Sequence, residues 1–255
     1  MSLPSYRLPA TWTRSAHALQ DRVVLVTGAY GGLGSAVARA AARAGAVVVM
    51  TGKRKRQLEQ LYDAMVAEGL PEPVIHPLDM ESATPRDYEA LADGLQRDLG
   101  RLDGIVHTAA SFAGLTPMAM HKPDAWLRAL HVNVSAPFAL TQACLPLLTA
   151  APDSAAVFVL DDPELLQRAH WGAYGVSKAA LERFVSILHE EHDAGAFRVH
   201  ALLPHPMRTT LRRTAYFGED TLQHPLPDTT ADAAIYLLSA DAAAVRGGVL
   251  DLRVA

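Results

Sequence analysis

The sequence predicts an α/β fold, a single domain built on a doubly wound parallel sheet of about seven strands. Apolar runs rich in β-branched residues alternate with segments of helical periodicity along the chain. This alternation is typical of parallel strands joined by right-handed helical crossovers, with helices on both faces of the sheet. The length of 255 residues suits one large domain better than two small ones, and half of the residues are hydrophobic, which suffices for a sizeable core.

Seven apolar runs are expected to form the strands, at 23–26, 46–51, 73–78, 102–108, 155–160, 198–203 and 248–252. Helices are expected over 36–44, 54–68, 84–99, 124–148, 174–194 and 232–238, with a bend in the fourth at Pro137. The third helix begins with a capping residue, Thr84, followed by a proline and by an acid three positions on. Residues 1–20 are taken as an N-terminal extension, and residues 21–255 as the domain.

Composition and charge exclude several classes of protein. The formal net charge is -4 with both signs interspersed, and the only basic cluster is the short run Lys53 to Arg56, so no nucleic-acid surface is expected. Cys144 is the only cysteine, which excludes an intrachain disulfide and a cysteine metal cluster, and no metal site is expected. The apolar runs are short and residues 1–20 lack a continuous apolar core. We therefore expect no membrane span and no signal peptide, and a cytoplasmic protein.

The strongest local motif is VVLVTGAYGGLG, residues 23–34. An apolar strand leads into a glycine-rich turn and then into an alanine-rich helix. Glycine lets the backbone bend sharply and approach a phosphate, and a helix N-terminus offers free N–H groups, so this arrangement predicts a dinucleotide site. The spacing is T-G-x-x-x-G-x-G, not the commoner G-x-G-x-x-G. The turn residues expected to line the site are Gly28, Tyr30, Gly31, Gly32, Leu33 and Gly34.

Two further loops bear on the choice of cofactor, because ligands in such sheets bind at the carboxyl ends of the strands. The second strand ends in Gly52-Lys53-Arg54, with two cations where an NAD site often has an acid. Because a cation would pair with a 2′-phosphate, NADP(H) is favoured over NAD(H). The alternative is that Lys53 and Arg54 merely begin a solvated helix. After the third strand, Asp79, followed by Met80, either accepts a hydrogen bond from an adenine amino group or caps a turn.

The pair Tyr174 and Lys178 is the strongest catalytic signal. Four residues apart on a helix, the two side chains share a face. A free phenol has a pKa of about 10, and a nearby ammonium lowers it. The pair is therefore suited to passing a proton to or from a substrate oxygen while hydride moves. Such spacing alone is common on helix surfaces, but it becomes specific together with the glycine turn.

In their order and spacing these motifs resemble the short-chain dehydrogenase/reductase family, from about residue 21 to 252. The segments that carry the resemblance are TGAYGGLG, LDM around Asp79, NVSA at Asn133 and YGVSK. The segment HWGAYGVSK resembles the corresponding segment in a bacterial branch of poorly characterised oxidoreductases in that family. The resemblance implies a Rossmann-type fold that forms homodimers or homotetramers largely through the helices containing Asn133 and Tyr174.

The resemblance also implies roles for individual residues. Tyr174 would be the proton donor or acceptor, and Lys178 both the electrostatic partner of the phenol and a ligand of the nicotinamide ribose. Asn133 would hold a water in the proton relay. Thr209 would contact the nicotinamide amide.

One departure concerns the catalytic site itself. The family usually has a serine thirteen residues before the tyrosine, where it donates a hydrogen bond to the substrate carbonyl; here that position is Asp161. A carboxylate cannot donate, would repel an oxyanion and would raise the pKa of the phenol. Asp161 could help only if it were protonated or if it bound a cationic substrate. Replacement donors would be Ser177, Thr108 or His107.

Other departures lie in the loops around the site. Thr108-Ala109-Ala110 stands where the family has N-A-G, which loses an asparagine and adds a methyl group near the cofactor. His205-Pro206 stands where P-G is usual, and His205, like His170, is expected to face solvent. Residues 207–227 correspond to the substrate loop of the family. An apolar pocket wall, or ordinary loop packing, is expected from Phe112, Trp171, Tyr216 and Phe217.

Three functions are compatible with these residues. The first is an NADP(H)-dependent oxidoreductase that acts on a small-molecule carbonyl or alcohol. The second is a nucleotide-binding protein with weak or no catalysis because of Asp161. The third, a nucleotide-sugar epimerase or dehydratase, usually needs a larger C-terminal substrate domain. The first is the favoured hypothesis.

Overall fold

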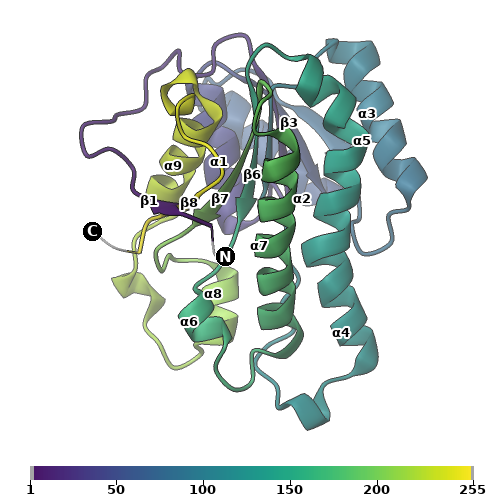
Figure 1. Cartoon of the computed structure of the whole chain (residues 1–255), viewed down its shortest axis with the longest axis vertical. Coiled ribbons are helices and arrows are strands. Elements are labelled where there is room, and N and C mark those ends of the chain that lie inside the picture. Colours follow the sequence, from purple (N-terminus) through teal and green to yellow (C-terminus); the bar gives the residue numbers. More distant parts are fainter. Residues whose placement is uncertain (1–2, 254–255) are drawn as a thin grey trace.

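A parallel sheet of eight strands runs through the computed structural model, which describes residues 3–253 (Figure 1). Its order is β1-β8-β7-β6-β5-β2-β3-β4, so the strand order reverses between β2 and β5. The strands are β1 Ser5–Tyr6, β2 Val23–Thr27, β3 Val47–Gly52, β4 Val74–Pro77, β5 Gly104–His107, β6 Ser154–Val159, β7 Phe197–Leu203 and β8 Val249–Asp251. All seven predicted strands are present.

The eighth strand, β1, comes from the N-terminal extension. It pairs in parallel with β8, with Ser5 opposite Val249 and Tyr6 opposite Leu250. A Cβ at Gly248 would lie 2.5 Å from the Tyr6 ring, so this ring packs where only glycine leaves room. The extension is therefore part of the sheet. The sequence could not predict this strand, because it is only two residues long and has no apolar pattern.

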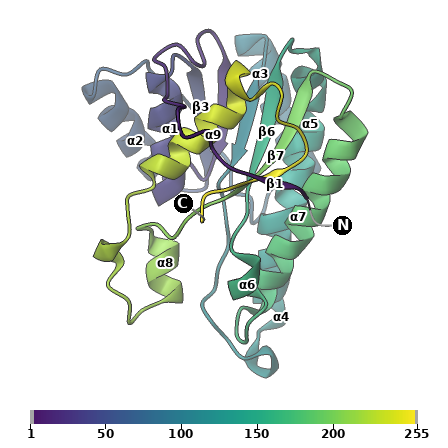
Figure 2. The ribbon, with the colours of Figure 1, turned by 60° about the vertical axis from the view of Figure 1, so that its left-hand side comes forward.

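Helices cover both faces of the sheet, as predicted. Figure 2 shows α1, α2 and α9 on one side of the strands and α3, α5 and α7 on the other. Each layer encloses its own buried apolar cluster, and β6 and β7 are buried along their whole length, as expected of a sheet covered on both faces. The helices are α1 Gly32–Arg43, α2 Lys55–Ala67, α3 Pro85–Leu99, α4 Pro123–Leu130, α5 Ala136–Ala150, α6 Pro163–Leu166, α7 Gly172–His192, α8 Thr210–Ala215 and α9 Asp228–Leu238.

The long helix predicted over 124–148 is interrupted. A π-helical turn, His131–Ser135, separates α4 from α5 and contains Asn133. Pro137 has no N–H to offer the carbonyl of Asn133, so the α-helical pattern fails in the turn before the proline. The stretch Pro123–Ala150 is also long and apolar enough to span a membrane by length and composition, which the sequence pattern did not suggest; half of its most apolar window is buried in the protein, as in a core helix.

Candidate active site

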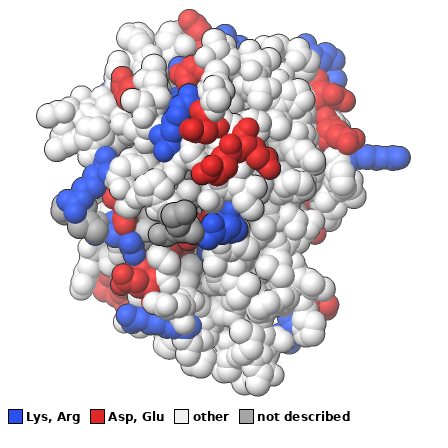
Figure 3. Space-filling view, in the orientation of Figure 1, with Lys and Arg blue, Asp and Glu red and all other residues white. Residues whose placement is uncertain are grey.

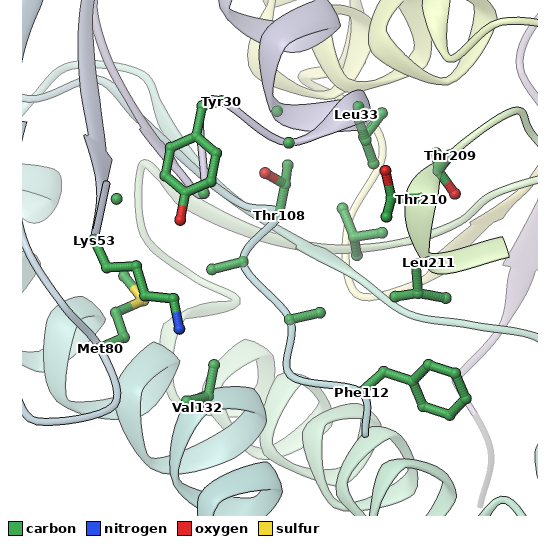
Figure 4. Close-up of a pocket in the computed structure, with 18 of the residues that line it drawn as sticks. Tyr30, Leu33, Lys53, Met80, Thr108, Phe112, Val132, Thr209, Thr210 and Leu211 are labelled. Atoms are coloured by element: carbon green, nitrogen blue, oxygen red, sulfur yellow. The ribbon is translucent and has the colours of Figure 1, made fainter. Parts of the chain in front are cut away.

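The carboxyl ends of the strands open into a cavity of about 660 Å³ (Figure 4). It lies where the strand order reverses, and the loops that follow β2 to β7 all contribute to its walls. The residues predicted to bind the cofactor all line this cavity: Gly28, Tyr30, Gly31, Gly32, Leu33, Gly34, Lys53, Arg54, Asp79, Met80, Thr108, Ala109, Ala110, Lys178 and Thr209. Of the predicted catalytic residues, Tyr174, Lys178 and Asp161 line it and Asn133 does not.

The glycine turn forms a tight cradle at the start of α1. Gly28 has a φ of 61°, a conformation that favours glycine. A Cβ at Gly34 would lie 2.3 Å from the Gly28 carbonyl oxygen and 2.8 Å from the Thr108 hydroxyl, so no side chain fits there. The first turn of α1 contains no acid. Free backbone N–H groups at this helix start therefore face the cavity in a form suited to a phosphate.

One end of the cavity carries the two predicted cations. In Figure 4 the side chains of Tyr30, Lys53 and Met80 lie along this end. The Lys53 ammonium pairs with the Glu81 carboxylate at 2.6 Å, and both groups are partly exposed. Arg54 forms no ion pair with any residue between 3 and 253. Glu81 was not predicted to line the cavity; its place two residues after Asp79 is the sequence feature that puts it near the site.

Asp79 has the local role that the sequence left open as an alternative. One of its carboxylate oxygens accepts a hydrogen bond from the Glu81 backbone N–H at 3.0 Å, which caps the turn after β4. The side chain still reaches the cavity wall beside Met80. Capping of the turn and contact with a ligand are compatible, because a carboxylate has more acceptor sites than this one bond uses.

The loop after β5 is fastened to β2. The Thr108 hydroxyl donates to the Thr27 carbonyl, and the Ala109 N–H donates to the Thr27 hydroxyl at 3.2 Å. Thr108 is therefore not a free donor for substrate, although it lines the cavity. The hydrogen bond from Thr108 to Thr27 attaches this loop to β2, although Thr108 replaces the asparagine that is usual at this position.

The prediction of Ser177 or His107 as a replacement donor is wrong, because both side chains are buried away from the cavity. The Ser177 hydroxyl donates to the Tyr174 carbonyl at 2.8 Å. The His107 ring stacks on Phe158 at 4.6 Å, and its Nε2 bonds to the Thr141 hydroxyl. Burial lowers the pKa of His107 to about 3, so the ring is neutral. Ser177 and His107 are close to site residues in the sequence, but their side chains are buried in the core and do not reach the cavity.

At the end of the cavity far from Lys53, Tyr174 donates a hydrogen bond to Asp161. The distance from the phenol oxygen to Oδ2 is 2.9 Å. The Lys178 ammonium donates to the Val159 carbonyl at 2.8 Å and lies 5.7 Å from the centre of the Tyr174 ring. Tyr174 and Lys178 thus share one face of α7, as predicted, but the acid at the end of β6 holds the phenol.

The charges of these groups oppose easy ionisation of the phenol. Burial raises the pKa of Tyr174 well above its usual value, and the negative charge and the hydrogen bond of Asp161 raise it further. Burial lowers the pKa of Lys178 to about 8, although Asp161 acts in the opposite direction. The effect of Asp161 on the pKa of the phenol was predicted, but the larger effect of burial was not.

Asn133 supports the site from behind. It is buried, and its amide donates to the Ser111 carbonyl at 3.0 Å and to the Ser177 hydroxyl at 2.9 Å. Its side-chain oxygen accepts from the Ser111 N–H at 2.7 Å. Asn133 thus holds the loop that leads to Phe112; its predicted role in holding a water stays a prediction.

Thr209 lines the cavity next to the glycine turn. Its hydroxyl accepts from the Arg212 N–H at 3.1 Å and caps α8, while a Cβ at Gly32 would lie 3.2 Å from its methyl group. Figure 4 shows Thr209 and Leu211 on the side of the cavity opposite Lys53. The short helix α8 was not predicted, and its residues Thr210, Leu211 and Thr214 add to the wall.

An aromatic cluster surrounds Tyr174, close to the predicted wall. Phe112 lines the cavity and meets Tyr174 edge-on at 5.1 Å, and Trp171 lies 5.9 Å from Tyr174. Tyr216 packs on Trp171 at 6.0 Å. Of the four residues predicted to form the wall, Phe112 lines the cavity; Trp171 and Tyr216 pack in the cluster without lining it, and Phe217 is 94% exposed.

His170 and His205, which were expected to face solvent, do not line the cavity. His170 is exposed, as expected. His205 is half-buried instead of facing solvent, and its Nδ1 lies 3.2 Å from the Thr230 hydroxyl. The end of β7 turns this ring toward α9.

The comparisons with known proteins agree with this architecture. The family model for short chain dehydrogenases matches residues 22–219. The chain is 33% identical over 233 residues to the uncharacterized oxidoreductase YciK of Escherichia coli, covering 91% of this chain and 92% of that one.

Two solved structures are also similar. One is described as a short chain dehydrogenase from Shigella flexneri complexed with NADP, with a TM-score of 0.89, 32% identity and coverage of 93% and 99%. The other is described as a short chain dehydrogenase from Escherichia coli CFT073 complexed with NADPH, with a TM-score of 0.89, 33% identity and coverage of 93% and 98%. The chain belongs to the short-chain dehydrogenase/reductase family of oxidoreductases.

Proposed function

We propose that the protein is an NADP(H)-dependent oxidoreductase whose substrate is a small molecule held beside Tyr174. The observation that carries this proposal is the single cavity that joins the glycine cradle and the cations Lys53 and Arg54 to Tyr174 and Lys178. The similar structures complexed with NADP and NADPH support the choice of coenzyme. The nicotinamide, when bound, supplies or accepts a hydride.

The residues of this chain have separate tasks in the proposal. The cradle at Gly28 and Gly34 binds the pyrophosphate, and Arg54 with Lys53 binds the 2′-phosphate. The Lys178 ammonium holds ribose hydroxyls from its position beside Val159, and Tyr174 presents its hydroxyl to the substrate. The residues of α8 that line the cavity shield it from water.

Calorimetry with NADPH and NADH tests the choice of coenzyme. We expect Arg54→Ala to weaken NADPH binding about tenfold and to leave NADH binding unchanged, because only NADPH carries the 2′-phosphate. Arg56→Ala is the matched control, since Arg56 is an exposed residue of α2 outside the cavity. Equal affinity of the parent for NADPH and NADH would contradict the proposal.

The second candidate is a nucleotide-binding protein with weak catalysis, and the bond from Tyr174 to Asp161 favours it. NADPH oxidation with a panel of carbonyl and imine substrates separates the two. Turnover in the parent that is lost in Tyr174→Phe supports the enzyme. NADPH binding without turnover in the parent, and turnover with carbonyls in Asp161→Ser, supports the binding protein.

A further inference from the structure

Asp161 places an acid beside the phenol at the substrate end of the cavity. Of the three acids that line the cavity, Asp79 and Glu81 lie at the end with Lys53, and Asp161 lies beside Tyr174. Its Oδ1 accepts from the Asp162 N–H at 2.8 Å, and its Oδ2 accepts from the Tyr174 hydroxyl at 2.9 Å. A carboxylate has about four acceptor positions, so each oxygen keeps one for a ligand.

The neighbouring cations have other partners. The Lys178 ammonium donates to the Val159 carbonyl, and the Arg212 guanidinium forms two hydrogen bonds of 2.7 Å with Glu219. Both cations feel the charge of Asp161, yet neither forms an ion pair with it in the described part of the chain. The carboxylate is therefore available to a cation that enters the cavity.

The walls around Asp161 suit an organic cation. Phe112 and Leu211 line the cavity, and the ring of Phe112 packs edge-on against Tyr174. A carboxylate next to aromatic and aliphatic side chains binds a cation through charge, cation–π contact and burial of the apolar part of the ligand.

We propose that Asp161 selects substrates in which the reacting group is a protonated C=N bond, an iminium ion, and not a carbonyl; this inference rests on the proposed function above. The N–H of the iminium ion donates to a free acceptor position of Asp161, and the Tyr174 hydroxyl positions the carboxylate. If a carbonyl were reduced in the same place, negative charge would develop on its oxygen next to the carboxylate, and the two charges would repel each other.

The requirements for protons agree with this assignment. Reduction of a carbonyl needs a proton on the oxygen, and here burial and Asp161 make the phenol a poor donor. An iminium ion already carries its proton. Hydride from NADPH adds to the carbon and the C=N π pair becomes the lone pair of nitrogen, which gives NADP⁺ and a neutral amine that takes a proton from water. No proton leaves the protein in this step.

Binding of a product-like amine tests the inference without turnover. Calorimetry on the protein loaded with NADP⁺ would compare tetrahydroisoquinoline, a cation at pH 7, with isochroman, in which oxygen replaces the nitrogen. We expect the amine to bind about tenfold to a hundredfold tighter, the effect of a hydrogen bond between charged groups. Asp161→Asn should remove this difference. Asp162→Asn, which removes the neighbouring charge that pairs with Arg253, should keep it.

Turnover with a matched pair of substrates gives a second readout. We expect dihydroisoquinoline to be reduced at least tenfold faster than tetralone by the parent, and the preference to reverse in Asp161→Ser. Equal binding of amine and isochroman by the parent, or faster reduction of tetralone, would overturn the inference and leave the proposed function intact. Failure of the parent to bind NADPH in a parallel titration would overturn both.

Discussion

Gly34 is the residue on which the geometry of the glycine cradle depends most directly. An added methyl group would meet the Gly28 carbonyl, the Thr108 hydroxyl and the Ala29 Cα, two of which are backbone atoms that cannot rotate away. Overpacking of this kind costs about 1–3 kcal/mol. The turn must therefore open to accept any side chain at this position.

We predict that Gly34→Ala destabilises the protein by about 2 kcal/mol and weakens NADPH binding more than tenfold, as measured by urea unfolding and calorimetry. The control is Gly94→Ala in α3, where the new methyl group would meet only the end of the Arg97 side chain at 3.7 Å. This control should be neutral or stabilising by up to about 1 kcal/mol, because alanine favours the helix. A Gly34→Ala protein with unchanged NADPH affinity would show that the cradle does not bind the coenzyme.

Single residues of the site could be predicted where a backbone motif fixes their place. The glycines and Tyr174 with Lys178 belong to such motifs, and each reaches the cavity. Glu81 could not be predicted, because its pairing with Lys53 depends on how two loops of different strands meet. The same limit applies to Ser177, whose hydroxyl points into the core.

At the scale of elements, the π-helical turn between α4 and α5 connects the helix layer to the active site. It places Asn133 behind the loop after β5, where one side chain satisfies both backbone groups of Ser111 and the hydroxyl of Ser177. An unsatisfied buried polar group costs about 1–3 kcal/mol. Asn133 therefore couples the two segments that position Phe112 and Tyr174.

We predict that Asn133→Ala lowers the free energy of unfolding by about 3 kcal/mol, because it removes both partners of the half-buried Ser111 backbone and one of the two hydrogen bonds of the buried Ser177 hydroxyl. Urea unfolding measures this loss. Thr149→Ala on α5 removes only an exposed bond to the helix's own backbone and should change stability by less than about 0.5 kcal/mol. Equal stability of Asn133→Ala and the parent would mean that the loop finds other partners.

The elements themselves were largely predictable, because strands buried on both faces are continuous apolar runs and the capping box at Thr84 marks the start of α3. The break in the helix around Asn133 was placed a few residues late, at Pro137, since a proline disturbs the turn before it. Helices α6 and α8 were missed because four and six residues carry too little periodicity. Tertiary contacts with the aromatic cluster hold them.

At the scale of the whole molecule, two buried histidines make stability depend on pH. Burial lowers the pKa of His107 to about 3, and burial together with the nearby charge of Arg198 lowers the pKa of His200 to about 3. In the unfolded chain a histidine has a pKa of about 6.5, so below that pH the unfolded state binds more protons than the folded state. Their stabilising contribution is complete above pH 6.5 and is lost as the pH falls toward 3.

We predict that the free energy of unfolding drops by about 3 kcal/mol per buried histidine between pH 7 and pH 4, as measured by urea unfolding. His107→Phe keeps the stacking on Phe158 but removes the titrating group, so it should reduce this pH-dependent loss. His17→Gln, at an exposed position, should leave it unchanged. An identical pH dependence in His107→Phe and the parent would exclude His107 as the cause.

The outer face of α5 and α7 is the basis for a prediction of the oligomeric state. Figure 1 shows these helices side by side, and right of the centre of the same view the surface is mostly uncharged (Figure 3). Phe138 on α5 and Val176 and Ile187 on α7 are about half exposed, and Phe138 meets Phe184 of α7 edge-on at 5.9 Å. An apolar face built from two helices is a typical site of contact between copies.

We predict a homodimer or homotetramer that uses this face, with a mass in light scattering of at least twice that of the chain. Ile187→Asp should give monomers, because a carboxylate cannot be buried between two copies without a partner. Val66→Asp introduces the same charge at an exposed position of α2 and should leave the assembly intact. Since α7 also holds Tyr174 and Lys178, loss of the contact should weaken NADPH binding in Ile187→Asp but not in Val66→Asp. A monomeric parent protein would contradict the prediction, and monomers with full NADPH affinity would show that the site does not depend on the second copy.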